Sequence, residues 1–313
     1  MDREELARAA GLIREGKLVA FPTETVYGLG ANALDAAAVE RIFRAKGRPS
    51  TSPLIVHVDS VDMARGLAAE WPAQAEILAR RYWPGPLTLV LPKRPQVPDI
   101  VTAGLATVGI RMPAHPLALA LIREAGVPIA APSANRFGQL SPTTAEHVRE
   151  ALGDRVDLIL NGGPTTVGIE STVLSLAVSP PHLLRPGMLS RQDIETVIGP
   201  VELAGRVENG ERGPHVSPGM HRRHYSPATR LVLVQGGAPL PAGRGVYLWL
   251  EHAAGAEKCI AMPGDPADYA AVLYATLYRE DKEGWDWIAV ESPPPSPEWS
   301  AVTDRLWRAS AGP

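Results

Sequence analysis

Apolar residues along this chain recur at two spacings, which predict helices and strands in alternation. Leu6, Ala9 and Ile13 fall on one face of a helix, and the apolar run 18–21 predicts a short buried strand. Further strands are predicted at 54–58, 87–91, 127–131, 158–160 and 172–176, and further helices at 73–82, 117–124, 144–152 and 191–198. Strands that alternate with helices in this way predict an α/β fold.

Two of the predicted helices carry recognisable boundary residues. Asp35 is a good N-cap for a helix that ends at Lys46-Gly47, where a cation and then a glycine suit the helix dipole and a left-handed cap. Ser190 and Asp193 have the spacing of a capping box at the start of helix 191–198.

The periodic pattern lapses between Gly199 and Thr229, a stretch rich in glycine, proline and charge. Periodicity returns with predicted strands at 231–234, 245–250, 258–261 and 287–290, and with helical faces at 269–276 and 299–309. We therefore expect a first domain over residues 1–200, an interdomain linker over 201–229 and a smaller α/β domain over 230–313.

Composition and charge exclude several classes of protein. The chain has 313 residues, of which 45% are hydrophobic, so it can bury the cores of two domains. A net charge of −3 provides no basic field to hold nucleic acid, and Cys259 is the one cysteine, so no disulfide or zinc site is expected. The charged start predicts no signal peptide, and no apolar run reaches the ~18 residues of a membrane span, so we expect a cytoplasmic location.

Four segments carry candidate chemistry, each with a plainer alternative. Residues 28–33 read Gly-x-Gly-x-x-Ala, but six residues separate Gly28 from the strand ending at Phe21, so this is a weak dinucleotide fingerprint. Lys46-Gly47-Arg48-Pro49 and the hydroxyls after it suit a polyanion such as triphosphate, or form an ordinary basic helix end.

Arg111 follows a strand and can bind a carboxylate through two hydrogen bonds, or form a surface ion pair. Ser133 and Asn135 follow small residues and can bind a ligand, or belong to a polar turn in which Ser141 or Thr143 caps the next helix. The pair His221 and His224 lacks acidic neighbours, so no metal site is expected there.

The order of these segments is more specific than any one of them. FPTETVYGLGANA, KGRPSTSPLIVHV, WPGPLTLVL, GIRMP, APSAN, STV and LLRPG occur in turn, and together they resemble the Sua5/YrdC family over residues 12–200. The linker, with SPGM and HRRHYSP, and the domain after it resemble the longer Sua5 form. This resemblance implies a YrdC-like domain with a twisted mixed sheet flanked by helices, and a smaller Rossmann-like α/β domain.

The resemblance implies an enzyme that makes threonylcarbamoyl-adenylate and pyrophosphate from L-threonine, bicarbonate and ATP. The carbamate of threonine attacks the α-phosphorus, and a separate tRNA threonylcarbamoyl transferase complex uses the product to modify adenosine-37. The chain has no P-loop, which agrees with attack at the α- rather than the γ-phosphate. Mg²⁺ would be held mainly by phosphate oxygens, with no metal ligands from the protein.

The resemblance also implies the site residues. Lys46 and Arg48 would be catalytic, and together with Ser52 they would bind the triphosphate. The nucleotide site would be completed by Thr107, Ser133, Asn135, Ser141, Arg185 and Tyr225. Tyr225 belongs to the linker, whose length and whose prolines, glycines, histidines and arginines over 217–227 predict a lid that folds over the site, or else a passive, solvated tether. Threonine would be held by Thr25, His57, Arg111, Ser171 and the backbone of Ala131, with Arg111 on its carboxylate.

Two other functions stay open at this point. A carbamoyltransferase of the same domain type would make carbamoyl-adenylate from carbamoyl phosphate, but its relatives carry acylphosphatase or zinc-finger domains that this chain lacks room for. A non-catalytic RNA-binding module would need a stripe of basic and aromatic residues, and none is evident in the sequence.

Overall fold

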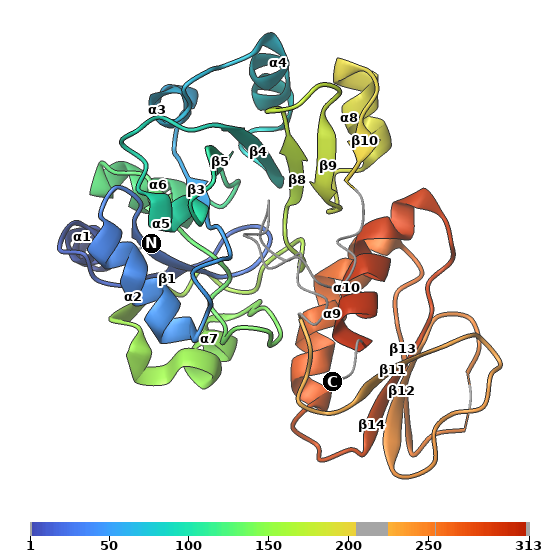
Figure 1. Ribbon diagram of the computed structural model, residues 1–313. Coiled ribbons are helices and arrows are strands. Elements are labelled where there is room, and N and C mark those ends of the chain that lie inside the picture. The colour runs from blue at the N-terminus through green and yellow to red at the C-terminus, as the bar shows by residue number, and fades with distance from the viewer. Residues whose placement is uncertain (1, 205–224, 254, 311–313) are drawn as a thin grey trace.

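The computed structural model describes residues 2–204, 225–253 and 255–310, which form two α/β domains (Figure 1). The helices of the first domain are α1 (Arg3–Arg14), α2 (Ala36–Lys46), α3 (Val61–Leu67), α4 (Ala73–Tyr82), α5 (Asp99–Thr102), α6 (Pro116–Ala125), α7 (Ala145–Leu152) and α8 (Arg191–Ile198). Its strands are β1 (Val19–Phe21), β2 (Gly28–Asn32), β3 (Ile55–His57), β4 (Leu87–Pro92), β5 (Thr107–Arg111), β6 (Ile129–Ala130), β7 (Leu158–Ile159), β8 (Thr172–Ser175), β9 (His182–Arg185) and β10 (Glu202–Leu203).

The first domain is built on one mixed sheet with the strand order β10-β9-β8-β4-β5-β3-β6-β2-β1-β7. Both faces of this sheet are buried, as the residues in and beside β1 show. Successive side chains of a strand point to opposite faces of the sheet, so neighbouring residues enter different cores. Val19 and Phe21 pack in the core beneath α1 and α6, whereas Leu18 and Ala20 pack in the larger core that contains α2. The expected mixed sheet with helices on both faces is confirmed.

The helix ends follow the predicted chemistry. Asp35 accepts hydrogen bonds from the amides of Ala37 and Ala38, and Gly47 closes α2 in the left-handed region at φ 62°. Ser190 and Asp193 form the capping box at the start of α8. The expectation that Ser141 or Thr143 caps the helix after residue 143 is wrong, because the side chain of Thr144 caps α7.

The sequence pattern did not predict β2, β9, β10, α3 or α5, all of which the structure contains. β2 includes the Gly-x-Gly of the weak dinucleotide fingerprint, so these glycines lie inside a strand and not at a turn into a helix. A side chain at Gly30 would come within 2.7 Å of Phe21 and 2.8 Å of Ile129, so close packing between strands requires this glycine.

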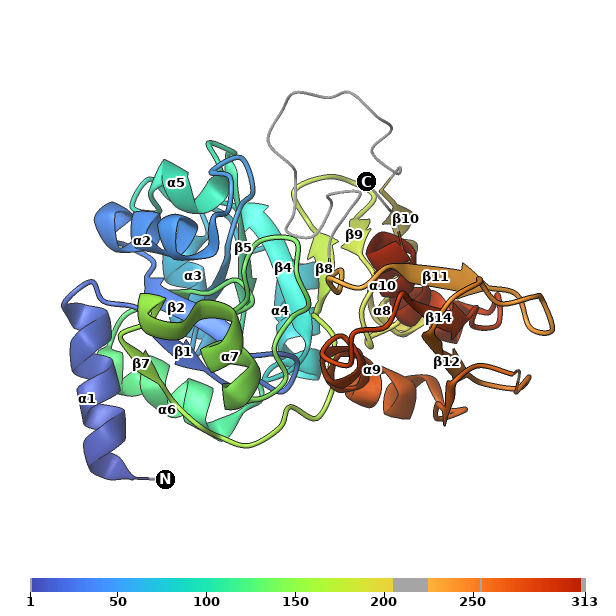
Figure 2. The same ribbon diagram turned by 90° about the horizontal axis from the view of Figure 1, so that it is seen from below.

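The second domain has a four-stranded parallel sheet in the order β11-β14-β12-β13. Its elements are β11 (Leu231–Val234), β12 (Gly245–Trp249), β13 (Lys258–Ala261), α9 (Pro266–Glu280), β14 (Trp287–Glu291) and α10 (Ser300–Ser310). Both views place α9 and α10 between this sheet and the first domain (Figures 1 and 2). The expected smaller α/β domain is confirmed.

One apolar cluster contains side chains from both domains. Val26, Leu140 and Ile169 of the first domain pack with side chains of α9 and α10. Gly168 allows the closest approach: its φ is 80°, and a Cβ there would lie 2.2 Å from the carbonyl oxygen of Ala270. The second domain therefore forms part of the wall beside residues 168–171.

Most of the expected linker, residues 205–224, lies outside the described residues, and so do His221, His224 and much of the expected lid. Before this gap, β10 pairs in parallel with β9 and belongs to the first sheet. After it, Tyr225 is buried. Within the described part of the chain, no helix has both the length and the apolar character that crossing a bilayer requires.

Candidate active site

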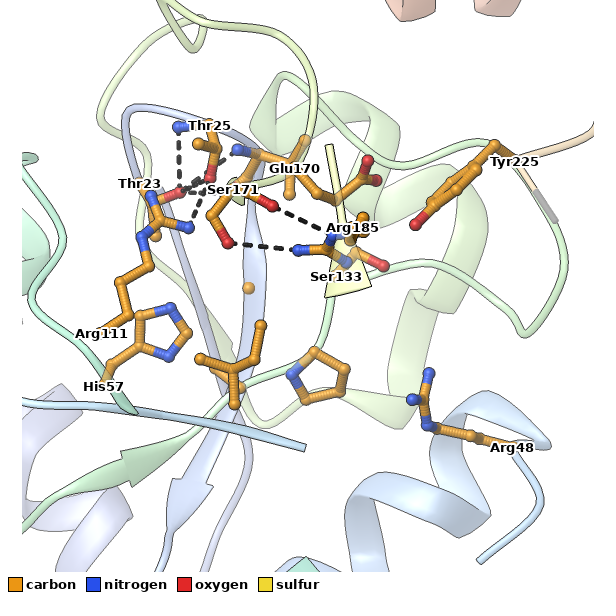
Figure 3. Close-up of a pocket in the computed structure, with 15 residues that line it drawn as sticks. Thr23, Thr25, Arg48, His57, Arg111, Ser133, Glu170, Ser171, Arg185 and Tyr225 are labelled. Atoms are coloured by element: carbon orange, nitrogen blue, oxygen red, sulfur yellow. Dashed lines mark hydrogen bonds between the residues drawn. The ribbon is translucent and has the colours of Figure 1, made fainter. Parts of the chain in front are cut away.

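Strand ends and loops of the first domain meet around one cavity (Figure 3). β3 and β5 run parallel with His57 opposite Arg111, so the carboxyl ends of both strands present their side chains together. Arg185 ends β9, and Ser171 directly precedes β8, the antiparallel neighbour of β9. The fold thus brings together four residues that the sequence analysis took from separate motifs.

The cavity has two chemically different ends (Figure 3). Thr25, His57 and Arg111 cluster at one end, and Arg48 and Tyr225 lie at the other. Between the two ends the lining includes Ala131, Ser133, Ser171 and Arg185. The residues expected to bind threonine and several of those expected to bind the nucleotide therefore face one shared space.

Arg111 is fixed on several sides by buried partners. Its guanidinium donates to the hydroxyl of Thr25 at 3.0 Å and to the carbonyl of Gly85 at 3.2 Å, and it lies 2.7 Å from a carboxylate oxygen of Glu24. A guanidinium held in this way is pre-organised, so little side-chain entropy is lost when it binds an anion.

His57 is a neutral imidazole in the cavity wall. Burial, with the nearby charge of Arg111 as a second cause, lowers its pKa to about 3. Its ring meets Phe21 edge to face, and among the described residues its Nδ1 has no hydrogen-bond partner. A buried nitrogen without a protein partner in a cavity wall is suited to a polar group of a ligand.

The shifted pKa of His57 predicts a pH-dependent stability. The unfolded imidazole binds a proton near its ordinary pKa of about 6.5, whereas the folded one does so only near 3. Between these values the unfolded chain holds more protons, so His57 lowers the free energy of unfolding by up to about 1.4 kcal/mol per pH unit as the pH falls.

His57→Asn should remove this contribution, so its stability should fall less steeply in acid than that of the unsubstituted protein. Urea unfolding between about pH 7 and about pH 4 measures the slopes. His182→Asn, which removes a more exposed imidazole, is the matched control. Equal slopes for His57→Asn and the unsubstituted protein would contradict the assignment of a buried neutral His57.

Two buried arginines give the other part of the cavity its positive charge. Arg48 donates to the carbonyl of Pro53 at 3.0 Å, and burial lowers its pKa to about 10, so it stays protonated near neutral pH. Arg185 donates to the carbonyl and the hydroxyl of Ser171 at 3.0 and 3.2 Å, and burial lowers its pKa as well. An anion beside these guanidinium groups would favour their charged forms.

Lys46 lies behind the wall of the cavity. Its ammonium donates to the backbone carbonyls of Ser133 and Asn135, and burial, together with Arg48, lowers its pKa well below the usual range. The amide of Asn135 donates in turn to the carbonyls of Arg136 and Gln139. In this structure Lys46 and Asn135 fix the turn that presents Ser133, and neither belongs to the cavity lining.

Other expected site residues also lie away from the cavity lining. Thr107 lines a second cavity, which shares Ile55 with the first. Ser52 is buried beside Arg48, which approaches its carbonyl at 3.5 Å. Ser141 is buried and donates its hydroxyl hydrogen bond to a carboxylate oxygen of Glu170.

Three polar or charged residues of this region were not expected from the sequence. Thr23 lines the cavity and shares a hydrogen bond of 2.8 Å with Thr25, and Glu24 pairs with Arg111. Glu170 also lines the cavity, directly before Ser171. Thr23 and Glu24 stand inside the segment FPTETVYGLGANA, and Glu170 directly precedes STV, so nearness to these segments was the available signal.

Among the described residues, no group of three or more histidine, cysteine, aspartate or glutamate side chains could hold a metal ion. The one carboxylate in the cavity lining, Glu170, is paired with protein groups.

Known proteins match both parts of the chain. The family model Sua5_yciO_yrdC, described as "Telomere recombination", matches residues 11–187, and Sua5_C, described as "Threonylcarbamoyl-AMP synthase, C-terminal domain", matches residues 189–311. Proteins from Pyrococcus abyssi and Bacillus subtilis, both named threonylcarbamoyl-AMP synthase, are each 45% identical to this chain, over 96% and 98% of it and 93% of their own lengths. A crystal structure of P. abyssi Sua5 complexed with L-threonine matches with a TM-score of 0.92 and 44% identity, over 99% of this chain and 95% of that one.

Proposed function

The chain belongs to the Sua5/YrdC family, and we infer from this membership that it is an L-threonylcarbamoyladenylate synthase. It converts L-threonine, bicarbonate or CO2, and ATP into threonylcarbamoyl-AMP and pyrophosphate. The reaction is an adenylyl transfer, which makes the enzyme a nucleotidyltransferase that serves threonylcarbamoylation of adenosine-37 in tRNA.

The structural observation that best supports this proposal is that one cavity has two chemically different ends. Arg111, Thr25 and His57 offer one end a fixed guanidinium, a hydroxyl and a neutral imidazole, which suit a small hydroxylated amino acid. Arg48 and Arg185 offer the rest of the cavity buried positive charge, which suits phosphates. A reaction that joins an amino acid to a nucleotide needs both in one space.

The proposed mechanism uses these groups for orientation and charge. Arg111 binds the threonine carboxylate. The neutral amine adds to CO2 with loss of one proton to solvent, or condenses with bicarbonate with loss of water, and becomes an anionic carbamate. A carbamate oxygen forms a bond to the α-phosphorus of ATP while the bond to pyrophosphate breaks. The carbamate is already a nucleophile, so the reaction needs no side-chain nucleophile, and Arg48 and Arg185 stabilise the charge that develops on the leaving group.

Several other expected residues fit this arrangement. Lys46 and Asn135 fix the turn that carries Ser133, and the backbone at Ala131 and the side chain of Ser171 line the space between the two substrates. We propose that the nucleotide extends toward the second cavity, where Thr107 lies and which adjoins the first at Ile55.

We further propose that Mg²⁺ accompanies ATP and is held by phosphate oxygens and water, since the cavity lining offers it one paired carboxylate. The adenylate would pass in the cytoplasm to a tRNA threonylcarbamoyl transferase complex. The net charge of −3 favours transfer through that complex over direct, tight binding of tRNA.

The proposal predicts pyrophosphate release that requires L-threonine and bicarbonate together with ATP and magnesium. A coupled phosphate assay with and without inorganic pyrophosphatase measures it, and mixtures lacking one substrate are the controls. Release of ADP and orthophosphate would contradict adenylyl transfer. Pyrophosphate release that depends on carbamoyl phosphate instead of threonine would favour the carbamoyltransferase alternative.

A further inference from the structure

A buried ion pair joins the second domain to the wall of the cavity. Arg305 on α10 has no exposed surface, and its Nε donates to a carboxylate oxygen of Glu170 at 2.7 Å. Its Nη2 donates to the backbone carbonyl of the same residue at 3.2 Å. Arg305 therefore holds both the side chain and the backbone of Glu170, the residue directly before Ser171.

Glu170 gathers partners from both domains. Ser141 of the first domain and Tyr274 of α9 both direct their hydroxyls at its carboxylate. Burial alone would raise the pKa of Glu170, but the charges of Arg305 and Arg185 outweigh it and lower the pKa. Glu170 itself lines the cavity, so the contacts that fix its carboxylate also fix that part of the cavity wall.

Tyr225 contacts the same arginine. The guanidinium carbon of Arg305 lies 5.2 Å from the centre of the Tyr225 ring, within the range of a cation–π contact. Tyr274 flanks the ring with a centroid distance of 6.0 Å. The backbone of Tyr225 has a φ of 61°, which is costly for an aromatic residue and persists only where the surroundings hold it.

The second domain also contacts the first domain at places away from the cavity. Tyr278 of α9 stacks on His147 with 4.0 Å between ring centres and donates to the carbonyl of Leu140. Lys282 pairs with Glu150 of α7 at 2.6 Å. A substitution at Arg305 does not remove these docking contacts. The effect of Arg305 on the site can therefore be measured separately from the effect of losing the contact between the domains.

We propose that Arg305 is a positioning residue of the second domain, whose contacts with Glu170 and Tyr225 set the nucleotide part of the cavity. This inference rests on the proposed function for the identity of the nucleotide. It gives the second domain a task in the reaction: the cavity wall at Glu170 and Tyr225 takes its binding geometry only when α10 is docked.

Calorimetric titration of the full chain with ATP and, separately, with L-threonine tests the proposal. Arg305→Met should weaken ATP binding about tenfold or more, within the usual range of coupling between sites. Threonine binding should change much less, because Arg111 and His57 lie at the far end of the cavity (Figure 3). Arg305→Lys keeps a charge for Glu170 but loses the planar group beneath Tyr225, so it should restore part of the ATP affinity.

Lys282→Met is the matched control, since it removes an interdomain ion pair that does not reach the cavity, and it should bind ATP as the unsubstituted protein does. If Arg305→Met does not fold, Arg305→Met with Glu170→Gln removes both charges and leaves no carboxylate buried alone. A folded variant of either kind with unchanged ATP affinity, or with ATP and threonine affinities lowered alike, would overturn the proposal. Failure of the proposed function would differ, because the unsubstituted protein would then bind ATP and release no pyrophosphate.

Discussion

Replacing Arg48 by alanine should lower the rate of pyrophosphate formation about 10²–10³-fold, which is the usual effect of removing one contact that strengthens in the transition state. Arg48 lines the cavity, is buried, and remains protonated near neutral pH because its pKa falls only to about 10.

We expect Lys46→Ala to lower the rate of pyrophosphate formation by a similar factor, for a different reason. Its ammonium fixes the carbonyls of Ser133 and Asn135, so the turn that carries Ser133 would lose its anchor.

Arg44→Ala is the matched control for both substitutions. Arg44 stands in the last turn of α2, the helix that contains Lys46 and ends just before Arg48, but it is exposed and pairs with Glu40. If Lys46 and Arg48 only stabilised the C-terminal end of α2 through the helix dipole, all three substitutions would have small and similar effects on turnover. Steady-state rates, measured on variants whose thermal unfolding shows a folded protein, decide the matter. Near-normal turnover of folded Arg48→Ala would contradict the phosphate assignment.

Arg111→Met should abolish most threonine-dependent turnover while ATP binding persists. The arginine offers the carboxylate of threonine a guanidinium already fixed by Thr25 and Gly85, so its loss should raise the KM for threonine about 100-fold or more. The substitution also leaves Glu24 buried without its cation, which typically costs about 3–5 kcal/mol of stability.

The variant Glu24→Gln with Arg111→Met separates the two effects. It removes both charges, so it should recover stability without recovering threonine-dependent turnover. Arg123→Met, which removes an exposed arginine paired with Asp59, is the control for loss of a positive charge. Titrations with threonine and ATP and a urea unfolding curve for each variant supply the measurements. A double variant with the KM for threonine of the unsubstituted protein would contradict the role of Arg111.

Local rules predicted much of the fold. Asp35, Gly47 and the pair Ser190 and Asp193 mark helix ends in the sequence, and the structure uses them at those ends. β2 escaped prediction because its sequence, GLGAN, has the composition of a loop. Its glycines are required by the packing of Phe21 and Ile129 against the strand, and such contacts come from neighbouring strands and not from β2 itself.

The sequence could predict a site residue only where its side chain lines the cavity itself, and not where its role depends on contacts with other parts of the fold. His57 was expected only from the family resemblance, and Arg111 also from its place at the end of a strand. The structure shows that both lie at the carboxyl ends of neighbouring parallel strands. Lys46 was expected to face phosphate, but its contacts with two carbonyls depend on how the turn after β6 packs against α2. Arg305 gave no signal, since an arginine in an amphipathic helix is usually exposed, and its partner Glu170 is 135 positions away.

The most direct test of the central claim is identification of the product by mass spectrometry. The unsubstituted protein is incubated with ATP, magnesium, L-threonine and ¹³C-labelled bicarbonate, and the mixture is analysed quickly because mixed anhydrides hydrolyse. We expect threonylcarbamoyl-AMP that carries one ¹³C atom, formed in step with pyrophosphate and absent when threonine is omitted. An adenylate without the label, or ATP consumed to ADP with no adenylate, would contradict it.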